Sequence, residues 1–143
     1  MSMDDQLLYD EVAVGDRYPT VRFEVSPLLL RSYGDLFDDE EYIQLAASKR
    51  GTVLRDPSIL ILFGILRAVL RNMDRQPPPG GVLAKQFYQF LRPLHVGQCL
   101  IVEPSIDDKY LKGEYRYVVL RCGINDEGGE AVGRVTSHVI WAR

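Results

Sequence analysis

The chain has 143 residues, with 17 basic and 20 acidic side chains and a formal net charge of −3. This length suits one domain, and a surface that binds duplex nucleic acid would show a basic excess that is absent here. The longest apolar run, residues 59–65, is too short to span a bilayer. We therefore expect residues 1–143 to form a single domain that binds neither nucleic acid nor membrane.

The start of the chain, MSMDDQ, lacks the cationic and apolar parts of a signal peptide, so we expect a cytoplasmic location. Cys99 and Cys122 do not have the spacing of metal ligands. In a cytoplasmic chain such cysteines are more often buried thiols than a disulfide.

The first elements are predicted to be a strand and two short helices. Residues 20–25 alternate and carry β-formers, which indicates a strand. Ser26-Pro27 then combines a helix cap with a proline at the first helical position, for a helix that ends at Gly34. An acidic stretch, residues 35–41, precedes a second short helix at residues 42–49.

A long helix is predicted over residues 57–72, because Asp56-Pro57 repeats the start signal. Its first half, SILILFGIL, is apolar on every side, which is typical of a helix surrounded by protein. Its second half carries Arg67 and Arg71 four residues apart, so one face there should reach solvent. The run QPPPGG then ends the helix.

The rest of the chain is predicted to be β-structure, with strands at residues 82–91, 100–106, 114–122 and 131–141. Pro104 indicates an edge or a bulge in the second of these strands, and NDEGG is a hairpin signal before the last. An apolar helix followed by strands requires a sheet that curls around it, which defines an α+β fold. Because one small sheet covers the helix incompletely, we also expect a homodimer.

Five strings carry a resemblance to a known family: YDEVAVGD, SYGD, PPPGGV, FLRPLHVGQCLIVEPSIDDKY and NDEGGEAVGR. Each resembles a string at the same place in the MaoC-like acyl dehydratases, which have the hot-dog fold. The resemblance implies binding of acyl thioesters of coenzyme A or acyl carrier protein. It also implies addition or removal of water across a (3R)-hydroxyacyl/enoyl pair, with no metal and no further cofactor.

The family's catalytic pattern is D-x-N-P-x-H, in which the Asp and His share acid–base work. Alignment on SYGD places the family's Asp at Asp35, the Asn at Phe37 and the His at Glu40. Alignment on Glu41-Tyr42 instead moves the His position to Phe37 and loses the Asp. We prefer the first alignment and predict Asp35 and Glu40 as the catalytic pair. The alternative is a solvated acidic loop in which Asp38 or Asp39 caps the second helix.

The resemblance also implies the residues that contact the substrate. A backbone N–H near Ser58, at the start of the long helix, would polarise the thioester carbonyl, where the helix dipole favours negative charge. Phe37, Asp56 and the loop glycines Gly80 and Gly81 are also predicted to contact the substrate. As alternatives, Asp56 is a helix cap and Ser58 an ordinary first-turn serine.

Several further residues have two interpretations each. Arg50 and Arg55 flank the loop before the long helix and are candidates for the phosphates of a carrier cofactor, or ordinary exposed arginines. His95 and His138 are expected to be structural strand residues. The tyrosines of the strands suit a dimer interface better than a platform for bases: Tyr88, Tyr110, Tyr115 and Tyr117.

Three functions remain open from the sequence. The first is a thioester dehydratase or hydratase with a variant site. The second is a thioesterase on the same scaffold, which would use one carboxylate. The third is a non-catalytic binding protein or subunit that accompanies an active homologue, because the histidine position and the Asn-Pro pair have been lost.

Overall fold

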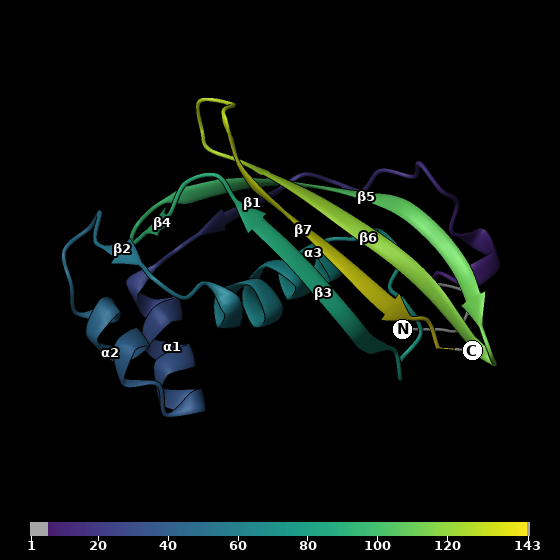
Figure 1. Cartoon of the computed structure of the whole chain (residues 1–143), viewed down its shortest axis with the longest axis horizontal. Coiled ribbons are helices and arrows are strands. Elements are labelled where there is room, and N and C mark those ends of the chain that lie inside the picture. Colours follow the sequence, from purple (N-terminus) through teal and green to yellow (C-terminus); the bar gives the residue numbers. More distant parts are fainter. Residues whose placement is uncertain (1–5, 143) are drawn as a thin grey trace.

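The computed structural model describes residues 6–142, and its main feature is a curled antiparallel sheet (Figure 1). Five strands follow the order β1-β5-β6-β7-β3, and a separate two-stranded ladder joins β2 to β4. The strands are β1 (Val21–Glu24), β2 (Val53–Leu54), β3 (Val82–Phe90), β4 (Leu94–His95), β5 (Cys99–Lys112), β6 (Tyr115–Asn125) and β7 (Ala131–Ile140). The helical segments are η2 (Tyr9–Glu11), α1 (Pro27–Phe37), α2 (Glu40–Ala46), η3 (Leu60–Ile65) and α3 (Leu66–Arg71).

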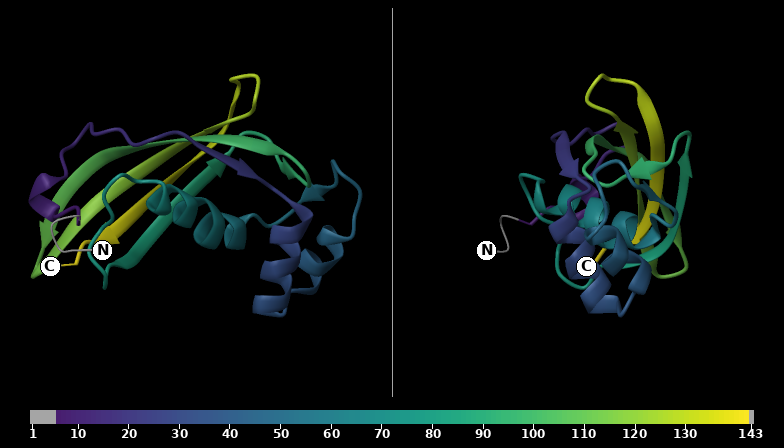
Figure 2. Two further views of the ribbon diagram at one scale, coloured as in Figure 1. Left: turned by 180° about the vertical axis from the view of Figure 1, so that it is seen from behind. Right: turned by 90° about the vertical axis from the view of Figure 1, so that its left-hand side faces the viewer.

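The central helix consists of η3, which is π-helical, and α3, and it runs along the concave side of the sheet (Figure 2). Leu60, Ile61 and Ile65 are at most 1% exposed. Gly64 lies in the π-helical part, where an added Cβ would meet Cζ of Phe23 at 2.7 Å, so only glycine lets β1 pack this closely. The predicted architecture, a curled antiparallel sheet around a buried central helix, is confirmed.

The two short helices form where the capping residues predict them. The Ser26 side chain accepts the Leu29 N–H at 3.1 Å at the start of α1. Asp39, one of the two caps that the sequence offers for α2, accepts the Tyr42 N–H at 3.1 Å. An added Cβ on Gly34 would lie 2.7 Å from a side-chain carbon of Ile43, so this glycine lets α1 and α2 pack together. Both helices lie at the end of the sheet where the central helix begins (Figure 1).

Strand β5 is longer than the predicted strand at residues 100–106, and it forms a long hairpin with β6. The prediction ended too early because the second half of β5 carries charged and exposed residues. The register with β6 shifts between Ile106 and Asp108. Pro104 lies beyond the last pair with β1, at Val102, and its carbonyl accepts the Tyr18 N–H. Because β5 lies between β1 and β6, Pro104 is not on an edge strand; it sits where the regular pairing with β1 has ended, so its missing N–H removes no hydrogen bond of the β1–β5 ladder.

Both cysteines lie in the sheet as free thiols. Cys122 is buried, and burial raises the pKa of its thiol to about 12, which suppresses the reactive thiolate. Cys99 is only half-buried. No helix within residues 6–142 is long and apolar enough to cross a membrane.

Candidate functional site

The first turn of the central helix is fixed by two hydrogen-bonded contacts. The Asp56 carboxylate accepts the Ser58 N–H at 3.0 Å, so Asp56 acts as the cap that its position predicts. The Tyr42 hydroxyl donates to the Asp56 carbonyl at 2.6 Å and accepts the backbone N–H of Leu60. Tyr42 thus bridges a carbonyl and an N–H that an ordinary α-helical turn would pair directly.

Tyr42 is 1% exposed, and this burial raises the pKa of its hydroxyl well above the usual range, against a smaller opposite effect of the Leu60 N–H. Its proton therefore stays in place at neutral pH. The residue holds the start of the central helix against α2, and it has no proton to exchange with a substrate.

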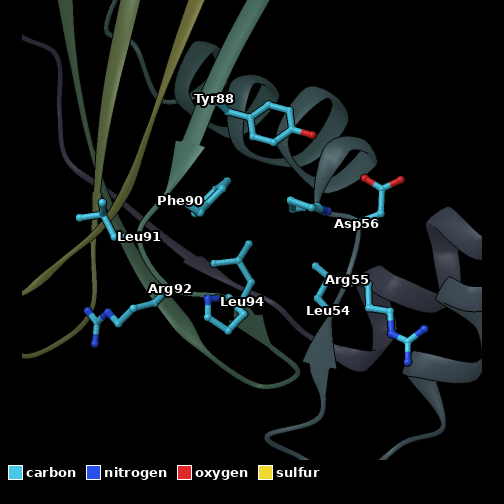
Figure 3. A pocket seen from close by; sticks show the side chains of 10 residues that line it. Leu54, Arg55, Asp56, Tyr88, Phe90, Leu91, Arg92 and Leu94 are labelled. Carbon is cyan, nitrogen blue, oxygen red and sulfur yellow. The ribbon is translucent and has the colours of Figure 1, made fainter.

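A cavity of about 450 Å³ lies beside this helix start (Figure 3). One wall is the helix start, and the other is the end of β3 with the residues that follow it. The lining residues are Leu54, Arg55, Asp56, Pro57, Tyr88, Phe90, Leu91, Arg92, Pro93 and Leu94. Leu54 and Leu94 are cross-strand partners in the β2–β4 ladder, so this ladder fixes the spacing of the two walls.

The cavity combines apolar surface with a few polar groups. Asp56 contributes a carboxylate, and Tyr88 contributes an aromatic ring and a hydroxyl from the opposite wall (Figure 3). Arg92 is held by its own acidic partners, Asp126 at 3.1 Å and Glu130 at 3.7 Å. A mostly apolar concavity with a few convergent polar groups is the usual form of a small-molecule site.

The acidic stretch lies away from the walls of this cavity. Asp35 is in the last turn of α1, where both of its carboxylate oxygens accept the Nε–H of Arg31, with N···O distances of 3.1 and 3.2 Å. Its side chain is 57% exposed. Glu40 is the first residue of α2 and is exposed. The predicted pair therefore sits on two helices that Asp38 and Asp39 connect.

The other predicted contact residues are divided between several places. Phe37, at the end of α1, contacts Phe63 of the central helix in a tilted arrangement, with 4.7 Å between ring centroids. Ser58 follows the lining residue Pro57, but its N–H is already bonded to Asp56. Gly80 and Gly81 precede β3, whereas the cavity lies at the end of β3, so the structure does not bring these glycines to the same site.

The two histidines lie in the β-structure, as predicted, and neither lines the cavity. Nδ1 of His138 is 2.9 Å from the Tyr110 hydroxyl, and burial lowers the pKa of His138. His95 belongs to β4, and its N–H donates to the Gln98 side chain. Within residues 6–142, no three acidic, histidine or cysteine side chains are grouped so as to hold a metal ion.

Sequence reasoning missed the roles of Tyr42 and Tyr88. Tyr42 served only to anchor an alignment, although a tyrosine on the inner face of a short helix is a signal for a buried hydroxyl that needs a partner. Tyr88 was grouped with the other strand tyrosines. Its place in the cavity depends on how the end of β3 faces the central helix, which the strand pattern does not show.

Comparison with known proteins finds no matching family model and no matching curated protein. Solved structures do match. The unliganded R-hydratase PhaJ1 from Pseudomonas aeruginosa has a TM-score of 0.68 at 17% identity, over 96% of this chain and 87% of its own. A MaoC-like dehydratase from Rhodospirillum rubrum has a TM-score of 0.65 at 19% identity, over 96% and 98%.

A third match is the HadBC (3R)-hydroxyacyl-ACP dehydratase complex from Mycobacterium tuberculosis, with a TM-score of 0.61 at 20% identity over 89% of this chain and 96% of that one. At such identities the likeness establishes the fold. The hot-dog fold is confirmed, and the structural neighbours are the MaoC-like dehydratases and (R)-hydratases that the sequence strings indicate.

Proposed function

We propose that this chain binds acyl thioesters of coenzyme A or acyl carrier protein in the cavity at the start of the central helix. We propose further that it is a variant (3R)-hydroxyacyl-thioester dehydratase or enoyl hydratase. The observation that carries this proposal is the cavity itself, whose lining combines apolar side chains with Asp56, Tyr88 and two arginines at a helix start. The fold shared with hydratases supports the same conclusion by analogy.

Hydration of an enoyl thioester needs a base that takes a proton from water as the oxygen adds to Cβ, and an acid that delivers a proton to Cα. A single carboxylate can do both in turn. The resemblance assigns this work to Asp35 and Glu40, and the cavity favours Asp56. Asp56 lines the cavity, whereas Asp35 is paired with Arg31 at the surface.

The thioester carbonyl also needs a hydrogen-bond donor as negative charge develops on its oxygen. The Ser58 N–H that the resemblance assigns is occupied by Asp56. The Tyr88 hydroxyl offers a donor in the same cavity. Movement of the Asp56 carboxylate toward a bound water would also release the Ser58 N–H, so both donors belong to the proposed site.

The test follows loss of the enoyl-thioester absorbance band with crotonyl-coenzyme A and longer enoyl-coenzyme A substrates. We expect turnover by the wild type and a decrease of about 10²- to 10⁴-fold in Asp56→Asn. Asp35→Asn and Glu40→Gln serve as matched controls and should stay near wild type. Loss of activity in these controls, with Asp56→Asn active, would instead establish the pair that the resemblance predicts.

Two outcomes would redirect the proposal. Release of free thiol from saturated acyl-coenzyme A would identify a thioesterase. Neither hydration nor thiol release, from a protein with the expected circular dichroism spectrum, would overturn the enzymatic part and leave thioester binding to be measured separately.

A non-catalytic subunit is the second candidate, and a specific observation favours it. Glu40 replaces the family's histidine, and the Arg31–Asp35 pair holds the remaining acid at the surface. Structural neighbours at TM-scores of 0.61 and 0.57 come from complexes named HadBC and ChsH1-ChsH2. Hydration by the purified, isolated chain would exclude this role.

We also propose that two copies associate through β3. This strand pairs with β7 on one side only, so its other edge carries free backbone groups. Phe87 is 58% exposed there. Sedimentation should give the mass of a dimer for the wild type and of a monomer for Phe87→Lys, which adds a positive charge to this edge of each copy. Leu111→Lys, at an exposed position on β5, is the control that should remain dimeric.

A further inference from the structure

A glycine in the middle of β6, Gly123, is not required by the packing of the chain itself. Its neighbours Cys122 and Ile124 are buried on the concave side of the sheet, so Gly123 faces the opposite, convex side (Figure 2). An added Cβ on Gly123 would meet nothing within 4 Å, and its φ lies outside the left-handed region that favours glycine.

Gly133, on the neighbouring strand β7, gives the contrast. An added Cβ on Gly133 would lie 2.5 Å from the carbonyl oxygen of Gln89, so the close approach of β3 requires this glycine. Gly123 has no such reason within the chain. A glycine inside a strand weakens it, and it often marks a place where a ligand comes close to the backbone.

Gly123 lines a hollow of about 370 Å³ on the convex side, which we call the Gly123 hollow. The register of the sheet pairs Gly123 with Glu103 of β5 on one side and with Arg134 of β7 on the other. Arg121 lies two residues earlier on β6, so its side chain leaves the sheet on the same side. All three side chains line the hollow around a position that has no side chain of its own.

The Gly123 hollow has an excess of one positive charge, because two arginines and one carboxylate line it. Within residues 6–142, neither Arg134 nor Glu103 takes part in an ion pair. Arg121 has an acidic neighbour, Asp107, at 3.9 Å, which is too long for a hydrogen bond. The N–H groups of both guanidinium groups are therefore available to a ligand.

The lining of the Gly123 hollow also includes apolar surface. Leu91, which follows β3 and is 67% exposed, and Ala131, at the start of β7, both belong to it. Guanidinium groups beside exposed apolar side chains suit an organic anion with a short apolar part better than an inorganic ion. One excess positive charge matches a monoanion, whereas the Glu103 carboxylate would repel a phosphate dianion more strongly.

We propose that the Gly123 hollow binds a small organic carboxylate, with the carboxylate on Arg134 and Arg121 and the apolar part over Gly123 against Leu91. The planar guanidinium group of Arg134 can donate two parallel hydrogen bonds to the two carboxylate oxygens. Leu91 is the one residue that this hollow shares with the cavity at the helix start. The proposal therefore goes beyond the proposed function and does not depend on a thioester.

Backbone amide chemical shifts of the full chain, followed during titration with sodium butyrate at constant ionic strength, test the proposal. We expect a saturable shift of the Gly123 amide with butyrate and none with butyramide, which has the same shape without the charge. Inorganic phosphate should bind more weakly than butyrate. Arg134→Gln should weaken butyrate binding by about tenfold, through loss of a charge-assisted contact. Lys112→Gln, at an exposed position of β5 outside the hollow, is the charge-matched control and should bind butyrate as the wild type does.

Gly123→Val gives a second measurement that leaves every charge in place. Because an added Cβ meets no other atom and valine favours strands, we expect this variant to be at least as stable as the wild type in urea denaturation. The valine side chain should fill the hollow and abolish the saturable shift, followed at the Arg134 amide. Gly133→Ala should instead lower the free energy of unfolding, because its Cβ would collide with the Gln89 carbonyl.

Each contrary outcome would overturn the proposal. Absence of a saturable shift in the wild type would show that the hollow binds no carboxylate. Equal binding of butyrate and butyramide, or of Arg134→Gln and wild type to butyrate, would remove the role of the arginines. Tighter binding of phosphate than of butyrate would overturn the class of ligand, and unchanged butyrate binding by a folded Gly123→Val would place the ligand elsewhere. None of these measurements uses thioester turnover, so the proposed function can fail or succeed separately.

Discussion

The start of the central helix and the connection between α1 and α2 use the same local chemistry with different surroundings. At each place a carboxylate caps a helix, Asp56 through the Ser58 N–H and Asp39 through the Tyr42 N–H. Asp56 is exposed, but it lines a cavity whose other wall is Tyr88 and the end of β3, whereas none of the acids between Asp35 and Glu40 lines that cavity. A cap becomes a candidate reactive group only where a second element of the fold lies opposite it.

The largest expected effect on stability comes from Tyr42, which joins the two regions. Tyr42→Phe removes the hydroxyl between the Asp56 carbonyl and the Leu60 N–H, in a place that water does not reach. Leaving buried polar groups unpaired costs about 1–3 kcal/mol. We expect a loss of this size in the free energy of unfolding, measured by urea denaturation.

Tyr115→Phe is the matched control, because Tyr115 is 56% exposed. It should change the free energy of unfolding by less than about 0.5 kcal/mol, as is usual for surface substitutions. Equal stability of Tyr42→Phe and wild type would mean that the Leu60 N–H re-forms a direct bond to Asp56, and that Tyr42 does not hold the helix start.

The next largest effect on stability is expected from the two helix caps, Asp56 and Asp39, which form the same kind of hydrogen bond. Asp56→Ala and Asp39→Ala should each lower the free energy of unfolding by about 1 kcal/mol, since each leaves a first-turn N–H without its acceptor. Asp56→Asn and Asp39→Asn keep a capping oxygen and should be near wild type in urea denaturation. A loss of thioester turnover in Asp56→Asn at unchanged stability would then report chemistry and not capping.

A smaller effect is the dependence of stability on pH. We expect it to come from His138, which lies in the sheet and not in the proposed site. Burial, and then the charge of Lys85, lowers the pKa of His138, while Asp107 and Asp108 oppose this. As pH falls below the ordinary histidine pKa, the unfolded chain takes up a proton before the folded chain does. Stability is therefore complete above about pH 6.5 and decreases as pH falls toward the lower folded pKa.

Thermal unfolding between pH 7.5 and 5 should show this decrease in the wild type and less of it in His138→Gln. Tyr110 loses its partner in this variant, so only the slope with pH, and not the stability at one pH, reports the titration. An unchanged slope would mean that other groups carry the pH dependence. If the pH dependence of turnover were lost in His138→Gln, His138 would belong to the site, and the restriction of the site to the helix start would be wrong.

The sequence predicts most of the fold because the fold follows from local patterns. The all-round apolar run places the central helix inside, and the caps at Ser26, Asp39 and Asp56 form as their residue types predict. The second half of β5 was missed because charged residues hide its alternation. Its pairing with β6 is set by the hairpin and not by its own composition.

The cavity could not be predicted in the same way, since it depends on residues far apart in the chain. Asp56 meets Tyr42 from 14 positions earlier, and the end of β3 from more than 30 positions later. The β2–β4 ladder that spaces these walls has only two residues in each strand, too few for a periodic pattern. The motif alignment pointed to Asp35 because it used sequence order alone.

The smallest expected effect tests the surface interpretation of the connection itself. The Arg31–Asp35 pair spans four positions of α1, with both side chains more than half exposed. Such pairs stabilise a helix by about 0.2–0.5 kcal/mol and weaken in salt. A double-mutant cycle of Arg31→Ala and Asp35→Asn should give this coupling energy, and 1 M sodium chloride should reduce it. A coupling above about 1 kcal/mol that persists in salt would show a desolvated carboxylate, because water no longer screens it. Asp35 would then be better shielded from water than its 57% exposed side chain indicates, and the acid–base pair of the resemblance would become the stronger candidate.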